Sequence, residues 1–289
     1  MKKLAIIILQ YNNSQLTFDL LRSIYNFEPK AKEWDIYVVD NNSNEDDNFE
    51  NIHQYFPNVI RQKNKINFGF AGGINSVIDK INAKYILLLN NDMVLLNNAI
   101  SKTLYNAELT KADVITCKII DENNKLQNTS NIKLNTMNIF LSLFGLMKIH
   151  EFIKKYTKHL IKVGYINGAF LMINFELYKN TGGLNESFFM YGEDIDLMLR
   201  LNKYNAIMYY SPEGVIKHLD GASAKKIWNN DSKYLLKIKN SIEAHKLNKN
   251  RFSFLILKYI LALKEVLKYF RHKKNIYIKS AKLILLNKR

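Results

Sequence analysis

One short segment predicts the architecture of the chain: Tyr85-Ile86-Leu87-Leu88-Leu89-Asn90-Asn91-Asp92. Five apolar residues in a row, without polar alternation, are typical of a strand that is buried on both faces of a parallel sheet. The segment then ends in two amides and a carboxylate. Because open α/β sheets bind ligands beyond the carboxyl ends of their strands, the segment predicts a covered sheet with a polar site at its edge.

Strand-like and helix-like patterns alternate on both sides of this segment. The predicted strands are Leu4–Leu9, Trp34–Val39, Val59–Arg61, Val114–Ile120, Tyr165–Ile173, Ala206–Tyr210 and Val215–His218. The predicted helices are Ser14–Tyr25, Ile74–Asn82, Asn98–Leu109 and Glu193–Asn202. This alternation predicts an α/β fold with a mostly parallel, Rossmann-like central sheet and helices on both faces.

The composition excludes several classes of protein. With 289 residues, 47% of them hydrophobic, the chain can bury a large core and is not disordered. Its single cysteine, Cys117, excludes an intrachain disulfide and a multi-cysteine metal site, and favours a reducing compartment. The apolar run near Met1 is too short for a signal peptide, and we expect neither a leader nor a transmembrane helix.

The net charge of +16 is distributed unevenly along the chain. Residues 1–224 hold 24 Lys and Arg against 23 Asp and Glu, whereas residues 225–289 hold 18 against 3. We therefore expect a nearly neutral main domain over residues 1–224, with an insertion at about 121–163, and a basic helical region over 225–289. A neutral body argues against a nucleic-acid-binding protein, which spreads basic charge over its binding face.

The basic region carries an amphipathic helical pattern. Its apolar stripe consists of Phe252, Leu255, Ile256, Tyr259, Leu263, Val266, Leu267 and Phe270, with lysines on the other side. Such a helix suits the anionic surface of a membrane. The alternative is that the stripe packs on the protein itself or on a second subunit of a homodimer.

Three further motifs contain chemically active side chains. Residues 190–197 include Glu193, Asp194 and Asp196 at the start of a predicted helix, where a carboxylate can act as a general base or simply complement the helix dipole. His218 ends a predicted strand and is either a metal ligand or a structural histidine.

Residues 67–75 form a glycine-rich turn that could approach a phosphate, although its spacing fits neither common phosphate-binding motif. Asn90–Asp92 could likewise be a Mg²⁺ or Mn²⁺ site or an Asx turn.

Taken in order, these motifs resemble those of the family 2 glycosyltransferases, in particular the bacterial rhamnosyltransferase-like branch. The matching stretches are Val38–Ser43, Asn67–Gly73, Leu87–Asp92, Gly182–Glu186, Phe188–Leu197, Lys217-His218 and Gly221–Ser223. The resemblance implies a GT-A fold, a nucleotide diphosphate sugar as donor, and Mn²⁺ or Mg²⁺ as cofactor. It covers about residues 4–224.

The resemblance also assigns roles to individual residues. It implies that Asp194 is the catalytic base with Glu193 as its neighbour, and that Asp92 and His218 hold the metal, with an asparagine at the first acidic position of the family's DXD motif. The donor-binding residues that it implies are Tyr11, Asp40, Asn42, Asn67, Gly72, Gly73 and Asn91.

The implied reaction is an inverting transfer to a glycan or a lipid-linked acceptor, in bacterial surface polysaccharide synthesis. The implied location is the cytoplasmic face of the plasma membrane. Two alternatives stay open, a glycoside hydrolase with paired carboxylates and a relative that binds nucleotide sugars without catalysis.

Overall fold

The computed structural model describes residues 1–44, 48–219 and 230–287. Nine of the described strands form one sheet, in the order β3-β2-β1-β4-β10-β6-β11-β5 with β8 paired to β11. These strands are β1 (Lys2–Gln10), β2 (Asp35–Asp40), β3 (Val59–Lys63), β4 (Ala83–Asn90), β5 (Met93–Leu95), β6 (Val114–Ile120), β8 (Ile161–Lys162), β10 (Phe170–Asn174) and β11 (Met208–His218). Only β5, β8 and β10 run opposite to the others, so the predicted mostly parallel sheet is present.

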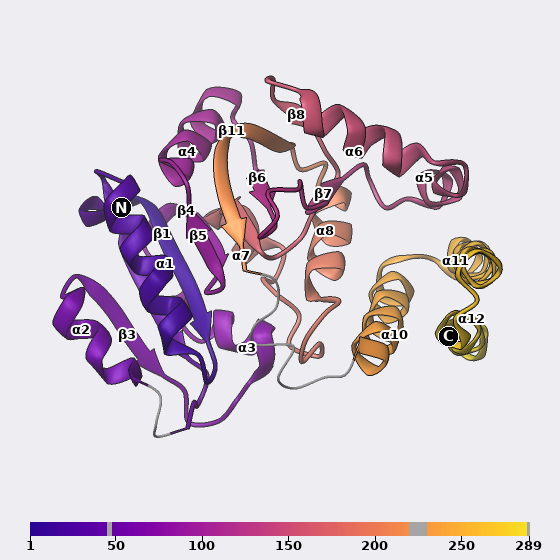
Figure 1. Cartoon of the computed structure of the whole chain (residues 1–289), viewed down its shortest axis with the longest axis horizontal. Coiled ribbons are helices and arrows are strands. Elements are labelled where there is room, and N and C mark those ends of the chain that lie inside the picture. Colours follow the sequence, from indigo (N-terminus) through magenta and orange to yellow (C-terminus); the bar gives the residue numbers. More distant parts are fainter. Residues whose placement is uncertain (45–47, 220–229, 288–289) are drawn as a thin grey trace.

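Helices cover both faces of this sheet (Figure 1). One face carries α1 (Ser14–Phe27), α2 (Ile52–Tyr55) and α4 (Ala99–Thr110), and the other carries α3 (Gly69–Asn75), α7 (Phe175–Asn180) and α8 (Glu193–Lys203). Adjacent residues of β4 belong to opposite cores: Leu87 packs under the first set of helices and Leu88 under the second. This explains why the strand is apolar throughout, since each of its faces is buried.

The strand order places two distant segments next to each other at the sheet's edge. Strand β5 follows Asp92 directly and pairs antiparallel with β11, with His218 opposite Met93. In addition, the backbone N–H of Leu219 donates to the carbonyl of Asp92 at 2.8 Å. The two residues of the predicted metal site therefore become neighbours through sheet pairing, although 126 positions separate them in the sequence.

Three predicted element boundaries were wrong. The helix predicted over Ile74–Asn82 begins at Gly69, ends at Asn75 and is followed by a 3₁₀ turn. The strand predicted over Tyr165–Ile173 is divided into β9 (Tyr165–Ile166) and β10. The two strands predicted over Ala206–Tyr210 and Val215–His218 are one strand, β11, with a register shift that a local pattern cannot distinguish from a turn.

The segment predicted as an insertion contains two helices, α5 (Thr136–Leu141) and α6 (Leu146–Tyr156), and the short strand β7 (Ser130–Asn131), which pairs with β9. A buried lysine on α6 holds this helix on the first part of the same segment: the Nζ of Lys154 donates to Asn128 Oδ1 at 2.9 Å and to the Ser130 carbonyl. The same Nζ lies 5.6 Å from the centroid of the Tyr210 ring on β11, in the body of the domain. Burial lowers the pKa of Lys154 to about 8, because its charged form is desolvated there.

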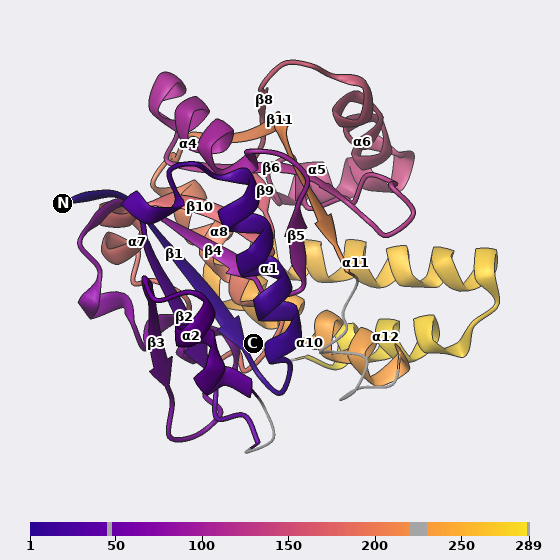
Figure 2. The same cartoon turned by 60° about the vertical axis from the view of Figure 1, so that its left-hand side comes forward.

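The described part of the basic region, residues 230–287, forms three helices, α10 (Asn230–Asn248), α11 (Arg251–His272) and α12 (Asn275–Leu286). They share a small core that includes Ile242, Phe254 and Ile284. Helix α10 packs against α8, and α11 packs against α5, so the region lies on the main domain (Figure 2). The predicted boundary at residue 224 falls outside the described residues, as do Gly221–Ser223 of the resemblance. Among the described helices, none has the length and apolarity that a membrane crossing requires.

Candidate active site

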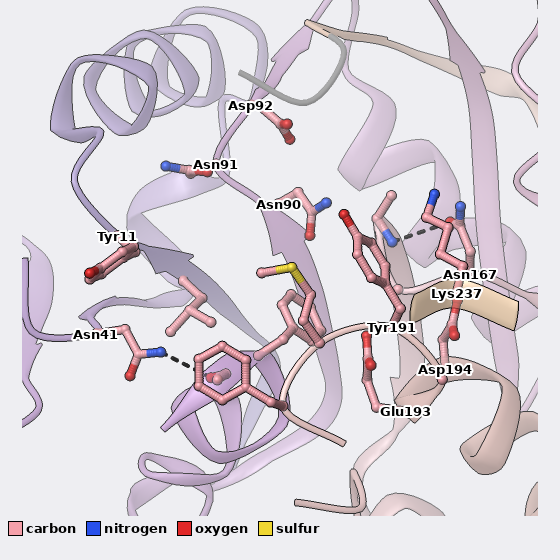
Figure 3. Close-up of a pocket in the computed structure, with 18 of the residues that line it drawn as sticks. Tyr11, Asn41, Asn90, Asn91, Asp92, Asn167, Tyr191, Glu193, Asp194 and Lys237 are labelled. Atoms are coloured by element: carbon pink, nitrogen blue, oxygen red, sulfur yellow. Dashed lines mark hydrogen bonds between the residues drawn. The ribbon is translucent and has the colours of Figure 1, made fainter. Parts of the chain in front are cut away.

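A cavity of about 600 Å³ lies beyond the carboxyl ends of β1 and β4 (Figure 3). Most of the residues expected from the sequence line it: Tyr11, Asn67, Asn91, Asp92, Glu193, Asp194 and His218. The position agrees with the rule that open α/β sheets bind ligands at this edge. The fold thus gathers into one cavity side chains from the first, middle and last parts of the main domain.

Asp92 and His218 form the first polar group of the cavity. The Nε2 of His218 lies 3.2 Å from Asp92 Oδ1, and its Nδ1 lies 2.8 Å from the amide oxygen of Gln127. Because an amide oxygen only accepts hydrogen bonds, Nδ1 donates to Gln127, and Nε2 is the ring nitrogen that faces Asp92 and that could hold a cation.

This pair fits a divalent cation. Within the described residues, Asp92 Oδ1 is buried and has no hydrogen-bond partner. A carboxylate oxygen that faces an imidazole nitrogen is the donor set that Mn²⁺ accepts, and Gln127 orients the imidazole as outer partners of metal ligands do. No group of three or more His, Cys, Asp or Glu side chains in residues 1–44, 48–219 and 230–287 could hold a metal ion. A cation at Asp92 and His218 would therefore need further ligands from a bound substrate.

Glu193 and Asp194 form the second polar group, at the start of α8. Tyr165 donates a hydrogen bond to Asp194 Oδ2 at 2.8 Å and holds that carboxylate in place. Burial raises the pKa of Asp194, and the bond from Tyr165 partly offsets this by stabilising the charged form. Burial and the neighbouring charge of Asp194 raise the pKa of Glu193 to about 8. Two adjacent carboxylates with raised pKa values, one buried and one half-buried, are typical of a site that moves protons.

The helix α10 completes the cavity, which we did not expect from the sequence. Lys233 and Lys237 of this helix line the cavity together with Tyr191. Asn240, also on α10, donates to the backbone carbonyls of Met190 at 3.0 Å and of Tyr191 at 2.9 Å. The first helix of the basic region therefore holds the loop that precedes Glu193.

Other expected donor-binding residues are absent from the cavity wall. The carboxylate of Asp40 is fully buried and accepts hydrogen bonds from Gln10 Nε2, at 3.0 Å, and from the backbone N–H and the hydroxyl of Ser43. Asn42 has a left-handed backbone, with φ of 66°, and is exposed outside the cavity. In the structure Asp40 therefore shapes the turn after β2, and neither residue reaches the cavity.

The two glycines of the predicted phosphate turn lie within α3 and act in packing. A Cβ on Gly73 would come within 2.5 Å of Leu9, and a Cβ on Gly72 within 2.8 Å of Phe68. The absence of side chains lets α3 lie close to β1. Neither glycine lines the cavity.

Asn41, rather than Asn42, reaches the cavity. Its Nδ2 donates to Asn67 Oδ1 at 2.8 Å and to the Gly69 carbonyl at 2.9 Å, so it organises the glycine-rich turn (Figure 3). No local pattern distinguishes Asn41 from Asn42, because the backbone turn between them sets which side chain faces inward.

Asn91 lines the cavity, but its amide donates to Thr17 Oγ1 at 3.2 Å and so connects the end of β4 to α1.

Comparison with known proteins agrees with this geometry. A rhamnosyltransferase, WbbL, of Escherichia coli K12 is 27% identical over 157 residues, which cover 50% of this chain and 58% of the relative. A low-salt glycan biosynthesis hexosyltransferase, Agl10, of Haloferax volcanii is 27% identical over 143 residues, which cover 48% of this chain and 45% of the relative. The chain thus spans about half the length of the curated relatives it matches.

A solved structure has the same fold. The crystal structure of GalNAc-T7 with UDP, GalNAc and Mn²⁺ aligns with a TM-score of 0.66 at 12% identity, over 92% of this chain and 51% of the other. It confirms the GT-A-like fold that the resemblance implied. The family model described as Glycosyl transferase family 2 matches residues 5–182, which is more than half of the sequence and includes most of β1, the glycine-rich turn and Asp92. On this match and this fold, the chain belongs to glycosyl transferase family 2.

Proposed function

We propose that the chain transfers a sugar, with inversion, from a nucleotide diphosphate sugar to a hydroxyl group of a glycan or a lipid-linked acceptor. One observation carries the proposal: a single cavity contains both the Asp92–His218 pair and the Glu193–Asp194 pair. The donor we propose is dTDP-rhamnose or a UDP-sugar, with the synthesis of a bacterial surface polysaccharide as the setting. The rhamnosyltransferase among the relatives supports this donor class.

Asp194 is the general base of the proposed reaction. It removes the proton from the acceptor hydroxyl while that oxygen bonds to the anomeric carbon and the bond from this carbon to the diphosphate oxygen breaks. Tyr165 holds the carboxylate in one orientation through its 2.8 Å hydrogen bond. Glu193, with its pKa raised to about 8, is largely protonated at neutral pH and can donate a hydrogen bond to the acceptor.

Asp92 and His218 would hold the Mn²⁺ or Mg²⁺ of the proposed enzyme, with Gln127 orienting the imidazole. A bound cation supplies charge neutralisation for the diphosphate leaving group. On the other side of the cavity, Tyr11 and the Asn41–Asn67 pair offer the ring and the polar groups for the nucleoside.

We also propose a peripheral position on the cytoplasmic face of an anionic membrane, and an exposed apolar surface supports the membrane contact. The stripe predicted on α11 points outward: Phe252, Tyr259 and Phe270 are 73%, 63% and 63% exposed. Helix α11 contacts α5, and Phe144 and Phe152, in the segment that contains α5 and α6, are exposed as well. Basic residues lie near these aromatic residues in the sequence: Lys148, Lys155, Arg271, Lys273 and Lys274. Aromatic residues beside basic ones are typical of helices that lie in the membrane interface.

Two substitutions test the catalytic assignment. We expect Asp194→Asn to lower the rate of transfer by about 10²- to 10⁴-fold while nucleotide binding is retained, because only proton removal is lost. We expect Asp92→Ala to weaken the metal-dependent binding of the nucleotide. Thermal shifts with UDP, dTDP, GDP and CDP, each with and without Mn²⁺, measure binding, and nucleotide release measures transfer. Asp79→Asn, an exposed acid outside the cavity, is the matched control. Full turnover in Asp194→Asn would contradict the assignment.

A second experiment tests the membrane surface. The triple variant Phe252→Gln, Tyr259→Gln, Leu263→Gln should sediment less with vesicles that contain anionic lipid, because it removes apolar area without changing charge. Tyr105→Gln with Leu109→Gln is the control, since both residues are exposed on α4. Equal sedimentation of the two variants would exclude this surface, and a shift from dimer to monomer in the triple variant would assign it to a second copy.

A further inference from the structure

Two lysines from the basic region belong to the cavity wall, Lys233 half-buried and Lys237 exposed. Lys233 and Lys237 are four residues apart on α10, so they lie on the same side of the helix, and both line the cavity. Their Nζ atoms lie 5.9 and 4.8 Å from the centroid of the Tyr191 ring. Two like charges on adjacent turns repel each other, and an anion bound beside them would reduce that repulsion.

The surrounding structure holds these lysines in position. The carbonyls of Met190 and Tyr191 accept hydrogen bonds from Asn240, two helical turns beyond Lys233. Gly192 has a φ of 105°, and a Cβ at that position would come within 2.8 Å of Asn240. The close fit of α10 on this loop therefore fixes the distance from the lysines to Tyr191 and to the acids that follow it.

Tyr191 lies between the two polar groups of the cavity. Figure 3 shows its ring in the middle of the cavity, with Asn90 and Asp92 beyond one side and Glu193 and Asp194 beyond the other. Burial, and then the charges of Glu193 and Asp92, raise the pKa of Tyr191 to about 12, so its hydroxyl is within electrostatic reach of both groups. The lysines beside this ring therefore lie between the Asp92–His218 pair and Asp194. A ligand that contacts both of these groups would lie next to the lysines.

The anion must be compatible with an otherwise acidic cavity. Asp92, Glu193 and Asp194 would repel a group with several negative charges unless cations offset them. Lysine is a common phosphate ligand because its ammonium group is a compact charge with three donors. The reactants of the proposed transfer that carry such charge contain phosphate.

We propose that Lys233 and Lys237 bind a diphosphate group in this cavity. The inference rests on the proposed glycosyl transfer and extends it, since it makes the C-terminal region part of the substrate site. The diphosphate belongs either to the nucleotide of the donor or to a lipid-linked acceptor, and both have the same charge chemistry. In each case α10 connects substrate binding to the helices that carry the exposed apolar surface.

The test compares Lys233→Gln, Lys237→Gln and the double variant with Lys239→Gln, an exposed lysine of the same helix that does not line the cavity. Isothermal titration with inorganic pyrophosphate, in Mg²⁺ and separately in EDTA, measures the shared chemistry. Since a hydrogen bond to a charged group contributes a factor of about ten or more, we expect binding about tenfold weaker in each single variant and unchanged in the control. Thermal unfolding of each variant checks that it is folded.

Two matched pairs of ligands identify the source of the diphosphate. If it is the donor, the double variant loses affinity for the nucleoside diphosphate that stabilises the wild type but not for its nucleoside. If it is the acceptor, the double variant loses affinity for farnesyl diphosphate but not for farnesol. Wild-type affinity for every diphosphate in the double variant would overturn the inference and leave the proposed function intact. A wild type that binds none of these ligands would overturn both.

Discussion

The carboxyl group of Glu193 should make the protein less stable as the pH rises. The side chain is 7% exposed, and within the described residues its Oε2 has no hydrogen-bond partner. Burial, with the charge of Asp194 as a second cause, raises its pKa from 4.5 to about 8. The change we consider is Glu193→Gln, which keeps the shape of the side chain and removes the charge.

The direction of the effect follows from proton binding. Below pH 4.5 both the folded and the unfolded chain hold the proton of Glu193, so this group then contributes its full stability. Between pH 4.5 and about 8 the folded chain keeps a proton that the unfolded chain has released. The free energy of unfolding therefore falls by up to about 1.4 kcal/mol per pH unit. Over the whole window the loss reaches at most about 5 kcal/mol, and it ends above the folded pKa.

Urea unfolding followed by circular dichroism at pH 5, 6, 7 and 8 measures this loss. We expect Glu193→Gln to be close to the wild type at pH 5 and more stable by several kcal/mol at pH 8 (about 3 to 5), because the glutamine has no charge to desolvate. Glu176→Gln, at an exposed acid on α7, should follow the wild type at every pH. If the free energy of unfolding changes with pH in the same way in Glu193→Gln and in the wild type, Glu193 is ionised at little cost in the folded protein.

Three other substitutions have defined outcomes. Tyr165→Phe removes the hydrogen bond that lowers the pKa of Asp194, so the acidic limb of the pH profile of kcat/KM should move to higher pH by up to about one unit. An unchanged acidic limb would mean that Tyr165 does not set the pKa of the catalytic base. Gly69→Ala should destabilise the fold by about 1–3 kcal/mol in a melting experiment, because φ is +73° and the new Cβ would lie 2.3 Å from the Phe189 carbonyl oxygen; an unchanged Tm would contradict this. Asn240→Ala leaves two loop carbonyls without their donor and should cost about 1–3 kcal/mol and raise KM for the donor; unchanged stability and KM would argue against a role for α10 in holding the loop.

Local sequence patterns were sufficient for the sheet and for most of its helices. The apolar run of β4 requires burial on both faces, and the structure divides its residues between two cores. The acids at the start of α8 and the histidine at the end of β11 could be recognised because they lie at the ends of elements that the local pattern predicts. Element boundaries were less predictable: the glycines expected to form a turn before the helix lie within α3, where they allow close packing against Leu9 and Phe68.

The same patterns could not assign inward-facing side chains or long-range partners. Asn41 and Asn42 are equivalent as sequence, and only the backbone turn places Asn41 in the cavity. Gln127 reaches the imidazole of His218 across 91 positions, and no periodicity signals such a contact. These partners are set by strand order and packing, which depend on the whole chain.

The basic region shows most clearly which properties the sequence determines and which depend on tertiary packing. Its sequence determines an amphipathic helix with excess positive charge, because helical spacing and charge are local properties. Which face of α11 is covered depends on its neighbours: α12 and α10 pack over Phe254 and Ala262, whereas most of the predicted stripe is exposed. The docking of α10 on α8 likewise brings Lys233 and Lys237 into the cavity. A local pattern specifies what a helix can bury, whereas the competition among all packing surfaces of the chain selects what it does bury.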